Sequence, residues 1–174
     1  MRWFYGLLMV AFLACSHNKQ VKSTVKPYFD LNGLIDHQVI LLDSLNPFLF
    51  KHGMHKGHEE VAEFKVPVIS WADELDIIRI ADINKPNLRG RYRMETNLLQ
   101  EDSMVRYVSN SGNTMVDSLE VCYNRYSNQI RWLKAMLHGE NLLFRSGSFL
   151  ELEFARDQAS SLLTVYRMSG WQKI

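Results

Sequence analysis

This sequence has a small net charge and contains few cysteines and prolines. Its 174 residues contain 20 Lys and Arg against 19 Asp and Glu, which gives a formal net charge of +1. This balance argues against a nucleic-acid-binding domain, because such domains carry a clear excess of basic residues. Two cysteines are too few for a disulfide-stabilised scaffold. The hydrophobic content of 47% is typical of a globular chain and argues against extensive disorder.

The main hydrophobic run lies at the N-terminus and is too short to cross a bilayer as a helix. Arg2 precedes about a dozen apolar residues, which end at Ala14-Cys15, and polar residues follow at once. A membrane-spanning helix needs about 20 apolar residues. A positive start, a short apolar core and a small residue before the cut are typical of a secretory signal. Residues 1–14 are therefore predicted to be a signal peptide.

The end of this run, Phe12-Leu13-Ala14-Cys15, resembles the lipobox of bacterial lipoproteins, with Phe12 where that class usually has Leu. The resemblance implies cleavage before Cys15 and three acyl chains (palmitate-type lipids) on that residue, enough for stable attachment to a membrane. An aspartate after the cysteine signals inner-membrane retention in some bacteria, and here Ser16 stands there. The expected location is the outer membrane, facing the periplasm, with the inner membrane or the cell surface as alternatives.

Behind the anchor we expect a short tether and one domain. Residues 15–26 comprise the lipidated Cys15 and a polar, flexible tether, and residues 27–174 form a single domain, because no later linker or repeat divides them. Cleavage removes Arg2 and no acid, so the mature chain has equal numbers of acidic and basic residues. It has little attraction for an anionic membrane, and its attachment rests on the lipid.

In the first half of the domain, the sequence pattern predicts two helices and a hairpin. Apolar residues at helical spacing, interrupted by the polar Gln38, predict a helix that begins near residues 27–30 and ends at Asn46-Pro47. Apolar segments on both sides of Lys56-Gly57 predict a hairpin. Ser70 is expected to cap a second helix that ends at residues 84–87.

From residue 89 onward the apolar pattern has a period of two, with turn signals every eight to twelve residues. The candidate strands are 89–98, 104–109, 115–124, 129–137, 141–145, 148–155 and 162–169. Connections this short favour antiparallel neighbours. The expected fold class is α+β: a curved antiparallel β-sheet, a meander of about six to eight strands, with two N-terminal helices packed on one face.

Three histidines, His52, His55 and His58, lie around the predicted hairpin turn at residues 56–57. His55 and His58 would face each other across the turn, close enough to share a metal. A zinc site needs three or four ligands and hydrogen-bond partners that orient each imidazole. No cysteine joins this segment, so the sequence favours exposed loop histidines. We expect no metal or other cofactor, with these histidines as the alternative.

Arg89, Arg91 and Arg93 form an alternating basic motif. On a strand these guanidinium groups would share one face, roughly 6–7 Å apart, and could bind the phosphate or carboxylate groups of an anion or a partner. The alternative is a solvated face whose charges are neutralised by acids such as Glu95 and Glu120.

No catalytic residue is assigned from the sequence. Cys122 lies mid-strand beside Glu120, whose charge would raise the thiol pKa, so we interpret it as a structural thiol. Asp73, Glu74 and Asp76 stand where acids favour a helix N-terminus. The sequence contains no nucleophile elbow, P-loop, dinucleotide fingerprint or zinc-protease helix.

These features predict a membrane-anchored periplasmic lipoprotein that acts as a non-enzymatic binding or scaffold module of the cell envelope, with an envelope protein as partner. One alternative is a carrier of an apolar lipid or acyl ligand in a half-barrel cavity. A second is a hydrolase whose site the sequence does not reveal.

Trp71, Trp132 and Trp171 are interpreted as core or edge aromatics.

The anchor predicts a specific product in a bacterium that processes lipoproteins. Intact-mass spectrometry should give a mature chain that begins at Cys15 and carries three acyl chains. Cys15→Ser should release the chain from the membrane fraction, because no other feature of the mature sequence anchors it. A chain that retains Met1 and an unmodified Cys15 would contradict this prediction.

Overall fold

The computed structural model describes residues 26–55, 58–64, 70–140, 143–156 and 161–173. The predicted signal peptide, Cys15 and the tether up to residue 25 lie outside these residues. The N-terminal half of the described chain forms α1 (Leu31–Leu45), β1 (Leu49–His55), β2 (His58–Phe64), α2 (Trp71–Asp76) and the 3-10 helices η1 (Ile77–Ala81) and η2 (Pro86–Leu88). The strands that follow are β3 (Tyr92–Leu98), β4 (Asp102–Ser109), β5 (Val116–Asn124), β6 (Ile130–Glu140), β7 (Arg145–Phe154) and β8 (Leu163–Lys173).

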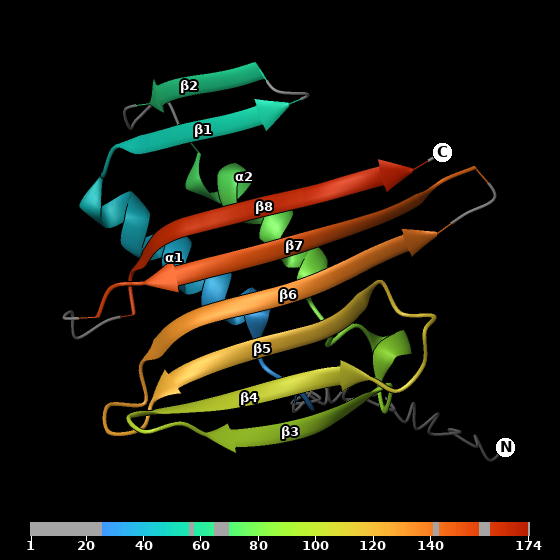
Figure 1. Ribbon diagram of the computed structural model, residues 1–174. Coiled ribbons are helices and arrows are strands. Elements are labelled where there is room, and N and C mark those ends of the chain that lie inside the picture. The colour runs from blue at the N-terminus through green and yellow to red at the C-terminus, as the bar shows by residue number, and fades with distance from the viewer. Residues whose placement is uncertain (1–25, 56–57, 65–69, 141–142, 157–160, 174) are drawn as a thin grey trace, which may run out of the picture.

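These strands form two antiparallel sheets (Figure 1). β3 to β8 make a six-stranded meander in which each strand pairs with its neighbours in the chain. β1 and β2 form a separate hairpin in which His55 stands opposite His58. The predicted antiparallel meander, the hairpin and the combination of sheet and helices are therefore confirmed.

The strand boundaries between residues 129 and 155 were predicted wrongly. His138-Gly139-Glu140 was expected to be a turn but ends β6, and Ser146-Gly147 was expected to separate two strands but lies within β7. A Cβ on Gly147 would lie 2.7 Å from Nε1 of Trp171 on β8. Glycine therefore serves here to admit a cross-strand indole rather than to make a turn. The final strand also continues past its predicted end at residue 169, to Lys173.

Local capping explains why the helices begin and end where they do. Asp30 Oδ1 accepts a hydrogen bond from the Gly33 amide at 2.8 Å, and Asn46 ends α1 in the left-handed conformation with φ 53°. Ser70 caps α2 as predicted, accepting from the Asp73 amide at 3.3 Å. α2 is shorter than expected and continues as η1. No helix in the described part of the chain is long and apolar enough to cross a membrane.

Apart from Cys122, the buried hydrophobic side chains of the helices and the six-stranded sheet belong to one core cluster. Its fully inaccessible members on the sheet are Leu119, Val121, Leu133, Leu150 and Leu152. They alternate along β5, β6 and β7 with polar residues, so these strands have a core-facing side and an opposite side.

Gln38, the polar interruption in the predicted helix face, joins α1 to the start of β8. Its side chain is fully buried. Nε2 donates to the Ser161 carbonyl at 2.8 Å, and Oε1 accepts from the Leu163 amide at 2.7 Å. The amide group thus satisfies one carbonyl and one N–H of a strand-entry segment that would otherwise be unpaired.

Gln38→Leu is expected to lower the free energy of unfolding by about 2–4 kcal/mol, because two backbone groups lose their partners in a dry environment. Urea denaturation followed by circular dichroism measures the change. His37→Leu is the matched control, since it adds the same side chain at a neighbouring exposed position of α1. Equal stability of the two variants would contradict the role assigned to Gln38.

Candidate functional site

A row of six charged residues crosses the side of the sheet that lies opposite the core, one from each strand. In register they are Glu95, Arg106, Glu120, Lys134, Glu151 and Arg167. Their signs alternate, so each charge has neighbours of opposite sign, an arrangement that favours the pairing of adjacent strands. Arg106 Nε lies 3.0 Å from Glu120, and Lys134 Nζ lies 2.8 Å from Glu151. The hydrogen bond from Lys134 lowers the pKa of Glu151.

Beside this charged row, toward the end of the sheet where β6 stops and β7 begins, lies a groove of about 520 Å³. Two cross-strand rows of β6, β7 and β8 line its floor. The first consists of Met136, Phe149 and Ser169, and the second of His138, Gly147 and Trp171. The volume falls within the range of about 300–1,000 Å³ that is usual for ligand sites.

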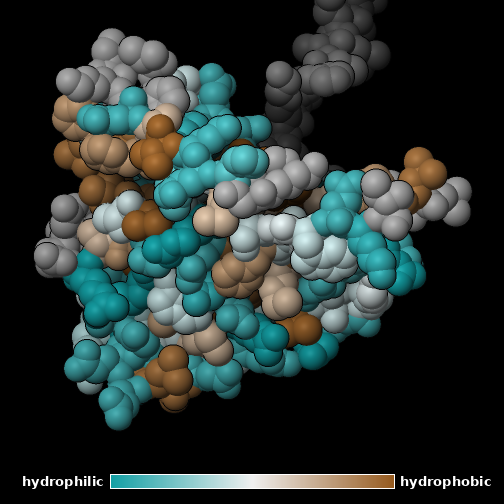
Figure 2. Space-filling model, turned by 45° about the horizontal axis from the view of Figure 1, so that its top comes forward, coloured by the Kyte–Doolittle hydropathy of each residue, from teal (hydrophilic) through white to brown (hydrophobic). Residues whose placement is uncertain are grey.

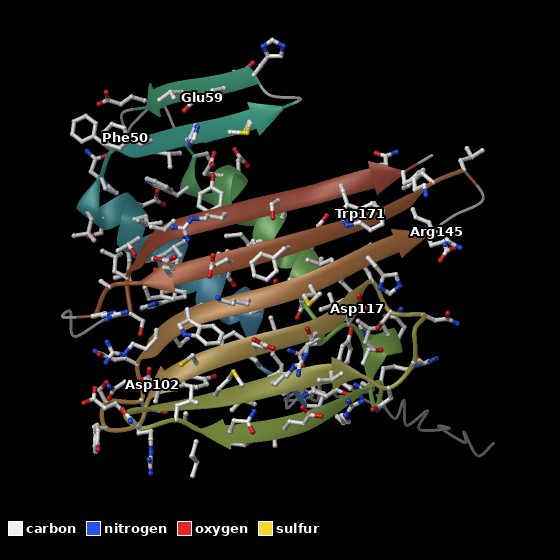
Figure 3. The ribbon with its side chains drawn as sticks, in the orientation of Figure 1. Phe50, Glu59, Asp102, Asp117, Arg145 and Trp171 are labelled. Atoms are coloured by element: carbon white, nitrogen blue, oxygen red, sulfur yellow. The ribbon has the colours of Figure 1, made fainter. Side chains whose placement is uncertain are left out.

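Trp171 is the dominant side chain of this groove (Figure 3). It is 61% exposed, although a tryptophan usually gains stability from burial. Its indole edge lies against Gly147, where an added Cβ would meet Nε1, Cε2 and Cζ2 at 2.7–3.1 Å. The missing side chain at Gly147 therefore gives the indole a fixed resting place on β7. Much of its remaining surface is accessible to a ligand.

Polar groups surround the aromatic floor. His138 Nδ1 lies 2.6 Å from Asp117 Oδ1, and its Nε2 lies 3.1 Å from the Gly112 carbonyl oxygen. Arg145 Nε lies 2.7 Å from Glu140 Oε1 at the end of the β6–β7 pair. Figure 3 shows Asp117, Arg145 and Trp171 at the same end of the sheet. These paired side chains are partly or largely exposed, so the remaining carboxylate and guanidinium atoms of Asp117, Glu140 and Arg145 are available to a bound molecule.

The predicted arginine motif does not form a strand. β3 begins at Tyr92, so Arg89 and Arg91 precede it, and Gly90 between them has φ 72°, which interrupts the extended backbone. Arg93 alone lies within the strand, with Nε 2.9 Å from Glu95 Oε1. The structure thus does not place three aligned guanidinium groups on one strand face. The period of two extended the predicted strand through a glycine that in fact occupies the left-handed region.

The histidine hairpin is present, but the described side chains in it form no metal-binding group. His52 Nε2 lies 2.7 Å from Glu59 Oε1. His55 and His58 are opposed in register as predicted, and the side chain of His55 lies outside the described part of the structure. Among the described residues, no three His, Cys, Asp or Glu side chains are grouped to hold a metal ion.

Cys122 is fully buried, although alternation places it on the side of β5 away from the core. Its register neighbours there are Met104 and Trp132. Burial, followed by the charge of Asp102 and a hydrogen bond with that carboxylate, raises the thiol pKa to about 11, against a smaller opposing effect of Arg131. The carboxylate that raises the thiol pKa is therefore that of Asp102 and not that of Glu120. The raised pKa suits the structural role predicted for this thiol.

Asp73 and Glu74, the acidic residues at the start of α2, differ from each other in their contacts. Asp73 supplies the amide that Ser70 caps. Glu74 does more than favour the helix dipole, because its carboxylate lies 2.5 Å from Lys51 Nζ on β1 and accepts a hydrogen bond from the Tyr166 hydroxyl on β8. Glu74 thereby connects the separate hairpin, α2 and the sheet. The raised pKa of Tyr166 is consistent with its burial and with this carboxylate.

Exposed hydrophobic side chains gather at a second place, where α1 leads into β1. Leu45, Phe48 and Phe50 are each more than half exposed there. Figure 2 shows hydrophobic surface at the left of the molecule, the side on which α1 and β1 meet in Figure 1, and Figure 3 labels Phe50 at that end of the hairpin. An exposed patch of this kind is typical of a contact with another macromolecule.

Comparison of the chain with models of protein families, with curated proteins and with solved structures finds no match. The groove was not predicted from the sequence, because Trp171 was interpreted as a core or edge aromatic. One available signal was the alternation Arg167-Met168-Ser169-Gly170-Trp171, which places the indole on the polar side of the strand. The arguments for function therefore come from the groove itself.

The surroundings of Cys122 predict low thiol reactivity. With Cys15→Ser as background, Cys122 should react with Ellman's reagent at pH 8 only when the protein is unfolded. A buried thiol with a pKa of about 11 is almost fully protonated at that pH. Ser169→Cys, which adds a thiol at an exposed position of β8, should react at once in the folded protein. Rapid labelling of Cys122 in the native state would contradict the prediction.

Proposed function

We propose that this chain is a lipid-anchored, non-enzymatic binding module of the cell envelope, attached through Cys15 to the outer membrane and facing the periplasm. In this proposal the sheet is curved, and both helices cover its core-facing side. The opposite side remains open for binding. The groove on β6, β7 and β8 is the ligand site, and an envelope protein contacts the exposed patch at the junction of α1 and β1.

One observation carries the proposal: the groove combines an exposed, positioned aromatic with polar groups at its margin. Trp171 and Phe149 are 61% and 37% exposed, and both lie on strands rather than on loops. A rigid strand framework fixes their positions before a ligand arrives, which reduces the entropy lost on binding. Concave sites with a mainly apolar lining and a few oriented polar groups are typical of ligand recognition.

The packing of the interior favours a binding module over a lipid carrier. The carrier alternative needs a large apolar cavity between the helices and the sheet. The core-facing leucines Leu133, Leu150 and Leu152 and the helix residues Leu31 and Ile35 are fully inaccessible and belong to the same cluster. Close-packed side chains of this kind occupy the volume that an acyl chain would need.

The proposed anchor limits where a ligand can be bound. Residues 15–26 can extend at most about 40 Å, so the domain stays within that distance of its membrane. A ligand at the groove would therefore be a component of the membrane-proximal envelope, or would be presented there. This restricted position raises the effective concentration of the domain for such a component.

Photo-crosslinking in cells tests both the anchor and the binding face. A photoreactive phenylalanine derivative placed at Lys173, on the exposed continuation of β8 past Trp171, should give a discrete adduct in the outer-membrane fraction. The same probe at Glu101, an exposed position in the turn between β3 and β4, should not give that adduct.

Adding Cys15→Ser should reduce the adduct, because the domain no longer stays near the membrane. An absent adduct at Lys173, or the same adduct with equal yield from Glu101, would contradict the proposed binding face.

A further inference from the structure

We propose that the groove binds a short oligosaccharide, with one sugar ring stacked on the indole of Trp171. The inference deepens the proposed function and rests on it, since it assigns a ligand class to the same site. It starts from the order of the side chains across β6, β7 and β8. This order places apolar and polar groups in successive cross-strand rows.

The rows follow from the register. The charged residues Lys134, Glu151 and Arg167 form one boundary of the groove. The next two rows are the floor that contains Phe149 and Trp171. The following row is again charged and consists of Glu140, Arg145 and Lys173. The groove is thus an aromatic floor between two charged rows, about 10 Å wide across three strands and about 20 Å long between the rows.

A pyranose ring has the complementary distribution of polarity. Its C–H bonds form apolar faces, and its hydroxyl groups point outward from the edge of the ring. One C–H face can lie on the exposed surface of Trp171, because the electron-rich face of an indole attracts weakly positive C–H groups. The hydroxyl groups then reach the margin, where Asp117, Glu140 and Arg145 present carboxylate and guanidinium groups. About two or three rings fit along the groove.

The same margin argues against an alkyl chain as the ligand. An alkyl chain would remove water from Asp117, Glu140 and Arg145 without offering a hydrogen bond in return, and each polar group desolvated in this way costs free energy. A saccharide offers a donor and an acceptor at every hydroxyl. The glycine at position 147 also matters, because a Cβ there would displace the indole from its resting place and remove the flat platform.

Calorimetric titration of the lipidated full chain in a zwitterionic detergent tests the ligand class. The probes are cellotetraose and the tetramer of N-acetylglucosamine, both of which present flat C–H faces. Sorbitol is the ligand control, because it has the hydroxyl groups without a ring. Binding of at least one tetramer, with no heat from sorbitol, is the expected result.

Variants locate the site. Trp171→Ala should weaken binding by about tenfold or more, and Trp171→Phe should recover part of the affinity, because a smaller aromatic face remains. Gly147→Ala should also weaken binding while Trp171 is retained. Tyr126→Ala is the matched control, since Tyr126 is an exposed aromatic (82%) in the turn between β5 and β6 and does not line the groove. Circular dichroism establishes that each variant is folded.

The outcomes separate the two proposals. If no tetramer binds at millimolar concentration, or if Trp171→Ala binds as the wild type does, the saccharide inference is overturned. If the adduct from Lys173 nevertheless forms in cells and contains a protein or a lipid, the binding face stands and the ligand class is wrong. If neither binding nor the adduct is observed, the proposed function is overturned together with the inference.

Discussion

The pairing register of β5, β6, β7 and β8 is the constraint on which both sides of the sheet depend. Leu119, Ala135 and Leu150 pair across the strands and are buried together, as are Val121, Leu133 and Leu152. The residues between them carry the charged row on the other side. Because side chains alternate, a slip of one residue would move leucines into water and bury the charges. Core packing therefore fixes the charged row and the groove beside it.

The groove owes its shape to small residues as much as to large ones. Gly147 stands between His138 and Trp171, and its missing side chain leaves a depression into which the indole edge settles. Charged pairs on both sides limit how far the apolar surface extends, which keeps the exposed aromatics from forming one large apolar patch. The formal net charge of +1 is consistent with this balance of signs. Recognition at such a site depends on local arrangement and gains little from long-range electrostatic attraction.

Sequence reasoning succeeded where the signals are local. The caps at Asp30 and Ser70 act within three residues, and the hairpin around residues 56–57 joins adjacent segments. It failed where the local conformational preference of a residue differs from the role that the residue has in the folded sheet. Gly147 was interpreted as a turn although it accommodates an indole, and Gly90 was included in a strand although its positive φ interrupts the extended backbone before β3. A glycine was thus taken for a turn where the strand continues, and for part of a strand where the strand has not yet begun.

The sequence by itself determined the period of two from residue 89, the helix caps and the antiparallel connections, because each depends on side chains a few residues apart. It also predicts the anchor at Cys15. Only the tertiary structure decided which strand positions face one another, and so which charges pair and where Trp171 rests. Cys122 shows the difference: alternation assigned it to the polar side, whereas the tertiary structure buries it beside Asp102, which raises the pKa of its thiol. Such contacts join residues far apart in the chain, and their energies arise only when the strands are in register.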